Sequence, residues 1–206
     1  VGPVLCLTHM AYLGHGTHLS FFFFLINRRR RTCTWARLGS GSCRASLGHS
    51  VVAVCFAAPT VEVGPAADDR LAHLGPDLCH ADVDLDAVLE RVAGSDPSTE
   101  IAEVLLDQRL AAGIGNVYKN EVLWACEVSP FQPLADVDEP TRRRLYETAA
   151  EQLQANLGRW KRQTHPKGLA VYNRAGQGCY RCLGRIRTIE HGDIGRRTWW
   201  CADCQT

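Results

Sequence analysis

The sequence predicts an α+β protein in which short strands precede a run of helices and a small β-hairpin follows them. Apolar residues recur at helical spacing over most of residues 84–159. Residues 51–63 are rich in valine and contain Pro59, a pattern typical of two short strands, 51–56 and 60–63. Two Cys-x-x-Cys pairs near the C-terminal end are separated by eighteen residues, which leaves room for a hairpin between them.

The charge of the chain is unevenly distributed, although its total is small. The 206 residues are 46% hydrophobic and 22% charged, with a net charge of +1, which is ordinary for a globular protein. Residues 1–60 contain six arginines and no acidic residue. Residues 61–158 contain seven basic and nineteen acidic residues, whereas residues 159–206 contain ten basic and three acidic ones. The basic C-terminal segment favours a polyanionic partner.

Residues 1–50 lack the pattern of a specified fold. Four phenylalanines are followed closely by four arginines, and no helical or strand period is sustained. This segment is therefore expected to be disordered or to come from a shifted reading frame. The apolar run 21–26 is shorter than the about 20 residues that a membrane-spanning helix needs. We expect no membrane partner; an anchor on a membrane surface is the alternative.

The cysteines outside the two pairs follow no regular spacing. The chain has ten cysteines and no segment with the pattern of a secretory signal. We therefore expect a reducing, cytoplasmic setting in which these thiols stay free. The scattered cysteines are Cys6, Cys33, Cys43, Cys55, Cys79 and Cys126.

Four helices are expected in the middle of the chain. The first carries apolar residues spaced i, i+3, i+4 and i+7, and the sequence Gly-Ser-Asp-Pro ends it. The second has an N-cap at Ser98 or Thr99, and the fourth begins at Pro140. A loop rich in glycine and proline follows, over residues 164–178. The expected helices cover residues 84–93, 98–109, 117–126 and 139–159.

The two Cys-x-x-Cys pairs predict one structural zinc ion. Each pair forms a tight knuckle that aims two thiolates at one point, and four thiolates suit a closed tetrahedral site. Such a site leaves no open position for catalysis at the metal. Redox use of the pairs is the alternative, which the lack of a βαβ pattern disfavours. The predicted ligands are Cys179, Cys182, Cys201 and Cys204.

Basic residues between and beside the cysteines predict a nucleic-acid interface. The planar guanidinium matches phosphate oxygens, and several of them on one small rigid element form an electrostatic footprint. A solvated basic surface is the alternative. The residues are Arg181, Arg185, Arg187, Arg196 and Arg197.

The turn Gly113-Ile114-Gly115-Asn116 between two helices is a second candidate phosphate site. Its glycines let the backbone pass close to a ligand, and the N–H groups that open the next helix point toward an anion. The Asn116 amide can add a donor to a phosphate oxygen. Taken alone, such a motif is more often a plain helix–helix turn.

Together these motifs resemble the formamidopyrimidine-DNA glycosylase and endonuclease VIII family. The run from Glu103 to Leu123, which includes the glycine turn, is similar to the helix–two-turn–helix of that family. His73–Leu78 is similar to the passage into its helical domain. Residues 171–182 and 195–205 are similar to its zinc finger. The resemblance covers about residues 61–206.

The resemblance implies a domain organisation and an activity. It implies a remnant of an N-terminal β-sandwich at 51–83, a helix–two-turn–helix DNA-binding domain at 84–163 and a zinc finger at 164–206. The family flips a damaged base out of double-stranded DNA, cuts its glycosidic bond and nicks the strand by β,δ-elimination. We therefore expect a bacterial-type monomer of base-excision repair, a DNA N-glycosylase and AP lyase associated with the nucleoid.

The same resemblance assigns roles to four residues outside the metal site. Asn116 and Arg196 are expected to grip the phosphates that flank the flipped nucleotide, and Arg196 also assists the elimination. Lys119 and Arg174 are further candidates for contacts with DNA.

The N-terminal part departs from the family. The family's nucleophile is an N-terminal proline amine followed by glutamate, but this chain begins Val1-Gly2-Pro3-Val4 and its first glutamate is Glu62. Thr17 stands where the family has a lysine in a Gly-Lys-His-Leu-like turn. We therefore expect impaired catalysis. The alternatives are a non-catalytic zinc-finger DNA-binding protein and a zinc ribbon that binds a protein partner.

Overall fold

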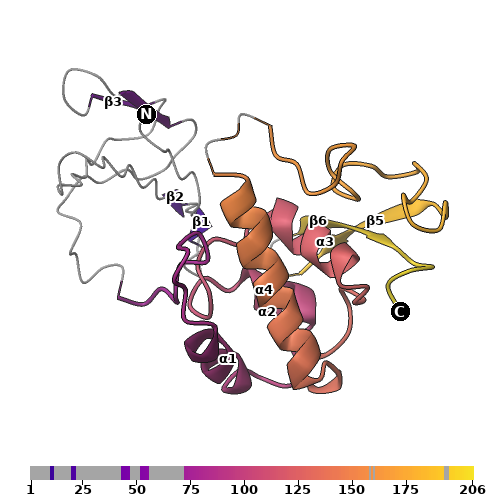
Figure 1. Cartoon of the computed structure of the whole chain (residues 1–206), viewed down its shortest axis with the longest axis horizontal. Helices are drawn as coiled ribbons and strands as arrows, with labels where there is room; N and C mark the ends of the chain where they lie inside the picture. Colours follow the sequence, from indigo (N-terminus) through magenta and orange to yellow (C-terminus); the bar gives the residue numbers. More distant parts are fainter. Residues whose placement is uncertain are drawn as a thin grey trace. The chain divides into compact units, whose positions relative to one another are not determined.

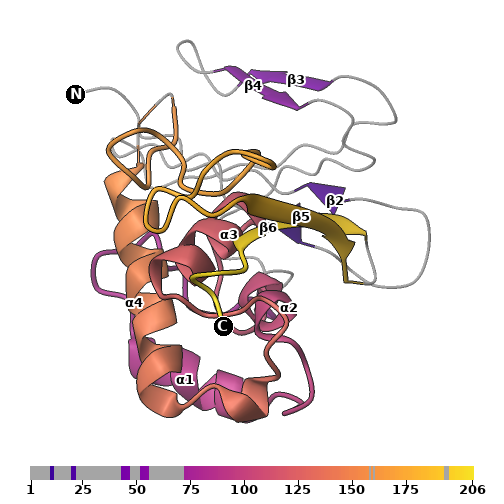
Figure 2. The same cartoon turned by 90° about the vertical axis from the view of Figure 1, so that its right-hand side faces the viewer.

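The computed structural model describes residues 10–11, 20–21, 43–46, 52–55, 72–157, 159, 161–192 and 195–206. The chain divides into two compact units, Val1–His73 and Leu74–Thr206. The described strands of the first unit are β1 (Met10–Ala11), β2 (Ser20–Phe21), β3 (Cys43–Ser46) and β4 (Val52–Cys55). β1 pairs with β2 (Figure 1), and β3 pairs with β4 (Figure 2), both antiparallel.

The N-terminal expectations can be compared with the structure only in part. β4 lies within the predicted strand 51–56. The predicted strand 60–63 lies outside the described residues, as do Pro3, Thr17 and Glu62 and most of residues 1–50. The expected remnant of a β-sandwich is not visible among the described strands, because they form two separate two-stranded sheets.

The second unit contains the four helices that the apolar periodicity predicts. They are α1 (Leu85–Ala93), α2 (Ile101–Leu106), α3 (Asn116–Ala125) and α4 (Glu139–Ala155). The Asp84 carboxylate caps α1 by accepting a hydrogen bond from the Ala87 N–H at 3.0 Å. The Asp138 carboxylate caps α4 by accepting one from the Thr141 N–H at 2.9 Å. Such caps satisfy N–H groups that the first turn leaves free.

The prediction for the start of α2 was wrong. The helix begins at Ile101 and has no side-chain cap, whereas the sequence favoured Ser98 or Thr99. The Thr99 carbonyl instead accepts from the Leu134 N–H at 2.9 Å, and the Ile101 N–H donates to the Gln132 carbonyl at 2.9 Å. Backbone pairing with a distant segment thus overrides the local capping signal.

α4 ends at Ala155, earlier than the predicted residue 159. The Asn156 side chain turns the chain at this point. Its Nδ2 donates to the Gln163 carbonyl at 2.9 Å, and its Oδ1 accepts from the Gln163 N–H at 2.7 Å. An asparagine that pairs with backbone groups in this way offers an alternative to further helical bonds.

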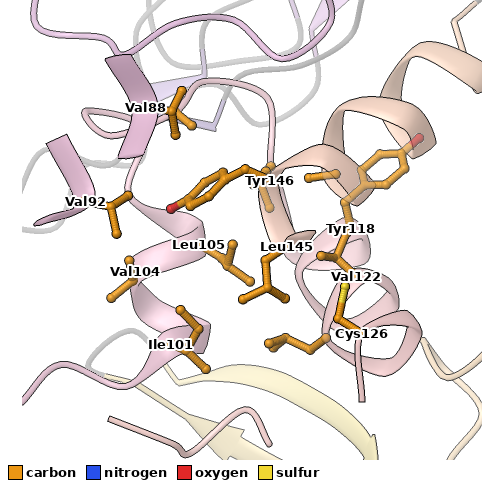
Figure 3. Close-up of a cluster of buried hydrophobic side chains, with 14 of the residues drawn as sticks. Val88, Val92, Ile101, Val104, Leu105, Tyr118, Val122, Cys126, Leu145 and Tyr146 are labelled. Atoms are coloured by element: carbon orange, nitrogen blue, oxygen red, sulfur yellow. The ribbon is translucent and has the colours of Figure 1, made fainter. Parts of the chain in front are cut away.

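The four helices surround one hydrophobic core (Figure 3). α1 packs against α4, and α3 packs against both α2 and α4. None of the described helices is long and apolar enough to cross a membrane. Core residues labelled in the figure are Val88, Val92, Ile101, Val104, Leu105, Tyr118, Val122, Cys126, Leu145 and Tyr146.

The C-terminal part forms the predicted hairpin and a smaller core of its own. β5 (Ile186–His191) pairs antiparallel with β6 (Arg196–Cys201), in a register that runs from Ile186 opposite Cys201 to His191 opposite Arg196. In both views β6 runs beside α3 (Figures 1 and 2). The second core contains Trp124, Ala170, Val171, Cys179, Ile186, Trp199 and Cys201.

Candidate functional site

The four cysteines of the two pairs meet at one point. Their Sγ atoms all lie within 4.8 Å of one another. The Sγ atoms of Cys179 and Cys204 are 3.9 Å apart, and those of Cys182 and Cys201 are 3.4 Å apart. Tetrahedral zinc with bonds of about 2.3 Å places its sulfur ligands about 3.8 Å apart. The cluster therefore has the dimensions of a four-thiolate zinc site.

N–H groups around the cluster favour the thiolate form of its sulfur atoms. The Trp124 indole donates to Cys179 Sγ at 3.3 Å, and the Arg181 N–H donates to the same atom at 3.4 Å. The Gly184 N–H donates to Cys182 Sγ at 3.4 Å. Burial alone raises the pKa of Cys179, but the N–H donors of Cys182, Trp124 and Arg181 outweigh it and lower that pKa to about 6.

The thiols of Cys201 and Cys204 require a nearby cation in order to ionise. Burial, followed by the neighbouring thiols, raises the pKa of Cys204 to about 12. Burial and then Cys182 also raise the pKa of Cys201. Four thiolates this close together repel one another strongly unless a positive ion lies between them. The sulfur atoms thus fit a divalent ion whose binding displaces the thiol protons.

One buried side chain, Gln108, organises the turn between α2 and α3. Its Nε2 donates to the Leu106 carbonyl at 3.1 Å and to the Ile114 carbonyl at 2.9 Å. Its Oε1 accepts from the Gly113 N–H at 3.0 Å. Gly113 has a φ of 118°, which L side chains rarely adopt. Gln108 thus holds the turn at three backbone groups, and α3 begins directly after it, at Asn116.

Polar residues on one face of α3 are bonded to three consecutive residues of β6. They are spaced i, i+3 and i+4, so they lie side by side on the helix. These bonds join the helical domain to the hairpin. They link Asn116 Nδ2 to the Arg197 carbonyl (3.0 Å), Lys119 Nζ to Thr198 Oγ1 (2.7 Å) and Asn120 Oδ1 to the Trp199 N–H (2.8 Å).

Lys119 lies inside the protein. Its side chain is 0% exposed. Burial lowers the pKa of Lys119 to about 8, while the Glu103 carboxylate raises it and the Arg196 guanidinium lowers it further. The Lys119 amine thus interacts electrostatically with the Glu103 carboxylate and with the Arg196 guanidinium. A direct contact between Lys119 and DNA stays a prediction.

Arg196 and Arg174 occupy different surroundings. Arg196 is half-buried at the start of β6. Within the described residues the adjacent Arg197 lies 4.0 Å from the Glu190 carboxylate, and Arg196 makes no ion pair. Arg174 donates to the Gly178 carbonyl at 2.9 Å, and its guanidinium lies 3.7 Å from the centroid of the Tyr180 ring. Arg174 therefore holds the knuckle loop, whereas the Arg196 guanidinium is not bonded to another residue in the described part of the chain.

Glu121 is a second buried charge on α3, and sequence reasoning missed its role. It is 0% exposed. Its carboxylate accepts hydrogen bonds from the N–H groups of Ala170 at 2.6 Å, Val171 at 2.9 Å and Tyr172 at 2.8 Å, and from the Thr164 hydroxyl. One side chain thus shapes the loop that enters the first cysteine knuckle.

Gln205 ties the second knuckle to the helical domain and was likewise not predicted to have a role. Its Oε1 accepts from the Cys201 N–H at 2.8 Å, and its Nε2 donates to the Val128 carbonyl at 3.0 Å. The signal that was available for these residues is polar character in otherwise apolar surroundings, since a buried amide or carboxylate must find partners. The partners themselves are backbone groups, which a sequence does not reveal.

Comparison with known proteins agrees with this architecture. The model of the formamidopyrimidine-DNA glycosylase H2TH domain matches residues 74–166. The chain is 31% identical to endonuclease 8 1 of Mycobacterium tuberculosis, over 92% of this chain and 75% of that protein. It is 38% identical to the probable endonuclease 8 2 of Streptomyces coelicolor, over 74% of this chain and 58% of that protein.

Two further similarities concern a lyase and a solved structure. The DNA-(apurinic or apyrimidinic site) lyase Nei2 of Mycolicibacterium smegmatis is 38% identical over 67% of this chain and 55% of that protein. The chain thus spans little more than half the length of several curated relatives. The Lactococcus lactis Fpg, solved with DNA that contains an abasic site, superposes with a TM-score of 0.57 at 24% identity over 86% of this chain and 73% of that chain.

A helical domain whose glycine turn is bonded to a four-cysteine hairpin defines a helix–two-turn–helix protein with a C-terminal cysteine finger. The chain belongs to the formamidopyrimidine-DNA glycosylase and endonuclease VIII family.

Proposed function

We propose that the second unit, Leu74–Thr206, binds damaged double-stranded DNA along the edge where α3 meets β6. The observation that carries this proposal is the bond from Asn116 to the Arg197 carbonyl, which joins the first residue of α3 to the start of β6. The N-terminal end of a helix offers N–H groups to a phosphate, and Arg196 offers a guanidinium beside it. Such groups on adjacent elements suit consecutive phosphates of one DNA strand.

The names of the relatives support the same proposal. Two of them are called endonuclease 8, and another is an apurinic or apyrimidinic site lyase. The Lactococcus lactis Fpg structures contain DNA with an abasic site or an oxidised pyrimidine. We infer from these names that the lesion-containing strand is the ligand of this chain, and that Arg174 contributes positive charge beside it.

We propose that one zinc ion occupies the cysteine cluster and has a structural role. Cys179, Cys182, Cys201 and Cys204 supply all four ligands, so no position remains for water or substrate. The ion would hold the two ends of the hairpin together. The hairpin in turn presents Arg196, so the metal acts on DNA binding through the fold alone.

We propose that the reaction of the family, excision of a base followed by β,δ-elimination, is impaired in a polypeptide of these 206 residues. Arg196 remains to assist elimination by holding the phosphate that departs. However, the sequence contains no proline followed by glutamate. A nucleophile and a general acid are each needed, and a positioned proton donor alone supplies about 10²–10⁴-fold. We therefore expect this polypeptide to bind damaged DNA without excising the base or cleaving the strand.

Arg196→Ala is expected to weaken binding to a duplex with a tetrahydrofuran abasic-site analogue by about tenfold to a hundredfold, because a charge-assisted contact with a phosphate is lost. The logarithmic dependence of affinity on salt should also become shallower by about one unit, since one fewer counterion is released. Fluorescence anisotropy at several salt concentrations measures both effects.

Arg143→Ala is the matched control for this measurement. Arg143 is a surface arginine of α4 that pairs with Asp86 in α1, so its removal changes the charge equally but away from the hairpin. It should leave affinity within about twofold. Equal effects of the two substitutions, or binding by the unaltered protein that does not depend on salt, would contradict the proposed interface.

Borohydride treatment of the unaltered chain with abasic-site DNA is expected to yield no covalent adduct, because trapping requires an amine that has formed a Schiff base with the sugar. Gel electrophoresis under denaturing conditions detects such an adduct. A shifted band that forms in parallel with strand cleavage would show that this chain retains a nucleophile and would overturn the proposed impairment.

A further inference from the structure

A chain of hydrogen bonds crosses the junction between the helices and the hairpin, and the Thr198 hydroxyl lies at its centre. Thr198 is 0% exposed. Its Oγ1 accepts from Lys119 Nζ at 2.7 Å and lies 3.1 Å from His191 Nδ1. His191 Nε2 in turn is bonded to the Glu100 carboxylate. Four elements therefore meet here: α3, β6, the end of β5 and the residue that precedes α2.

The donors and acceptors in this series of hydrogen bonds can be assigned in one consistent order. Lysine has only donors, so Lys119 must donate to the Thr198 hydroxyl, whose own proton is then free to point to His191 Nδ1. In the tautomer that accepts at Nδ1, His191 carries its proton on Nε2 and donates it to Glu100. Each of the four side chains has at least one partner in this arrangement, and bonds in such a series polarise and strengthen one another.

The burial of Lys119 indicates that its amine serves this connection rather than packing. A methionine or leucine would fill similar space without the desolvation that lowers the pKa of Lys119 to about 8. The two other bonds between α3 and β6 use backbone groups of Arg197 and Trp199, which any residue supplies. Of these three bonds, the one to Thr198 uses a side chain of β6.

A bond to a side chain defines the register of a strand. Successive residues of a strand face opposite sides, so a slip of β6 by one residue would replace the Thr198 hydroxyl with an arginine or a tryptophan. Arg196 is two residues before Thr198 and faces the same side of the strand. The bond that holds Thr198 therefore also determines where Arg196 emerges beside Asn116.

We propose that Lys119 and His191 are positioning residues, which act through Thr198 to hold β6 in register against α3 and so aim Arg196 at the DNA backbone. The effect on DNA rests on the proposed function of the α3–β6 edge. The effect on β6 is a property of the protein without DNA, and the two can be measured separately.

The test compares Thr198→Val with Thr198→Ser in the full chain. Valine keeps the shape of threonine without the hydroxyl, whereas serine keeps the hydroxyl without the methyl group. In the protein without DNA, hydrogen exchange of the β6 peptide should become about tenfold faster in T198V and change less than twofold in T198S. Exchange in α4 serves as the internal reference, and one zinc per chain shows that each variant retains the finger.

Binding to the tetrahydrofuran duplex should follow the same order, about tenfold weaker for T198V and within about twofold for T198S. Lys119→Met should resemble T198V, and the K119M/T198V pair should be no worse than either single variant, because both remove the same bond. His191→Phe should also speed exchange in β6.

Two results would overturn the proposal. If hydrogen exchange of the β6 peptide in T198V and K119M equals that in the unaltered protein, the bond between Lys119 and Thr198 does not hold β6. A larger effect in T198S than in T198V would mean that Thr198 acts by packing its methyl group. Failure of the unaltered protein to bind the duplex would instead remove the proposed function, while the exchange comparison would still decide the role of the bond.

Discussion

Cys182→Ser is expected to reduce bound zinc from one ion per chain to less than about one tenth and to unfold the hairpin while the four helices stay folded. Cys182 is exposed, so its replacement removes a ligand and little packing. Structural zinc in small fingers contributes about 10–16 kcal/mol of apparent binding free energy, which is far more than the small core around the hairpin can replace.

The survival of the helices follows from the separation of the two cores. The larger core lies within residues 78–153 and contains no residue of the hairpin. The smaller core takes Trp124 from the end of α3, with the neighbouring Ala125 packed against it. Loss of the metal should therefore change the fluorescence of Trp199 and Trp200 and leave most of the helical circular dichroism. A chelator should reproduce both effects in the unaltered protein.

Cys79→Ser is the control for the loss of a thiol. Cys79 lies outside the cluster, near the turn at Gly113. Its variant should keep one zinc ion, measured by elemental analysis after gel filtration. Retention of a full equivalent of zinc by the Cys182 variant would mean that the four cysteines do not form the site described above.

Glu121→Ala is expected to lower the free energy of unfolding by about 4 kcal/mol, because three backbone N–H groups lose their acceptor in a buried loop and each unsatisfied group costs about 1–3 kcal/mol. A domain of this size has only about 5–15 kcal/mol of stability, so the variant should approach the limit of folding. Urea unfolding in the presence of zinc measures the change.

Two further variants serve as comparisons for Glu121→Ala. Glu121→Gln keeps the size but turns an amide donor toward the N–H groups of residues 170–172, so it should lose at least half as much stability as the alanine variant. Glu151→Ala, at an exposed position of α4, should change stability by less than about 0.5 kcal/mol. A loss below 1 kcal/mol for Glu121→Ala would contradict the role assigned to its carboxylate.

The elements with strong local signals were predictable from the sequence. α1 and α4 have an aspartate cap followed by an apolar stripe, and both begin where those signals indicate. The cysteine spacing predicted the hairpin, and Ile186 and Trp199 pack in the core beside the cluster. The neighbouring Trp200 contacts Phe131 instead, with ring centroids 4.9 Å apart.

The junction between α3 and β6 was not predictable, for a physical reason. Asn116 was singled out as a group for phosphate, and Lys119 as a lesser one, without any indication that both are bonded to β6. Their partners lie about eighty residues away in the sequence. Local propensity carries no information about such distances. The spacing of Asn116, Lys119 and Asn120 on one helix face was nevertheless a sign that this face meets another element.

The position of α3 limits how freely parts of this protein could be exchanged with those of relatives. Seven consecutive residues of α3, Tyr118–Trp124, are buried, because one face packs in the large core, another holds β6 and a third holds the loop before the first knuckle. A finger grafted from another family member would meet a helix built for a different strand. The smallest interchangeable module is therefore α3 together with the finger.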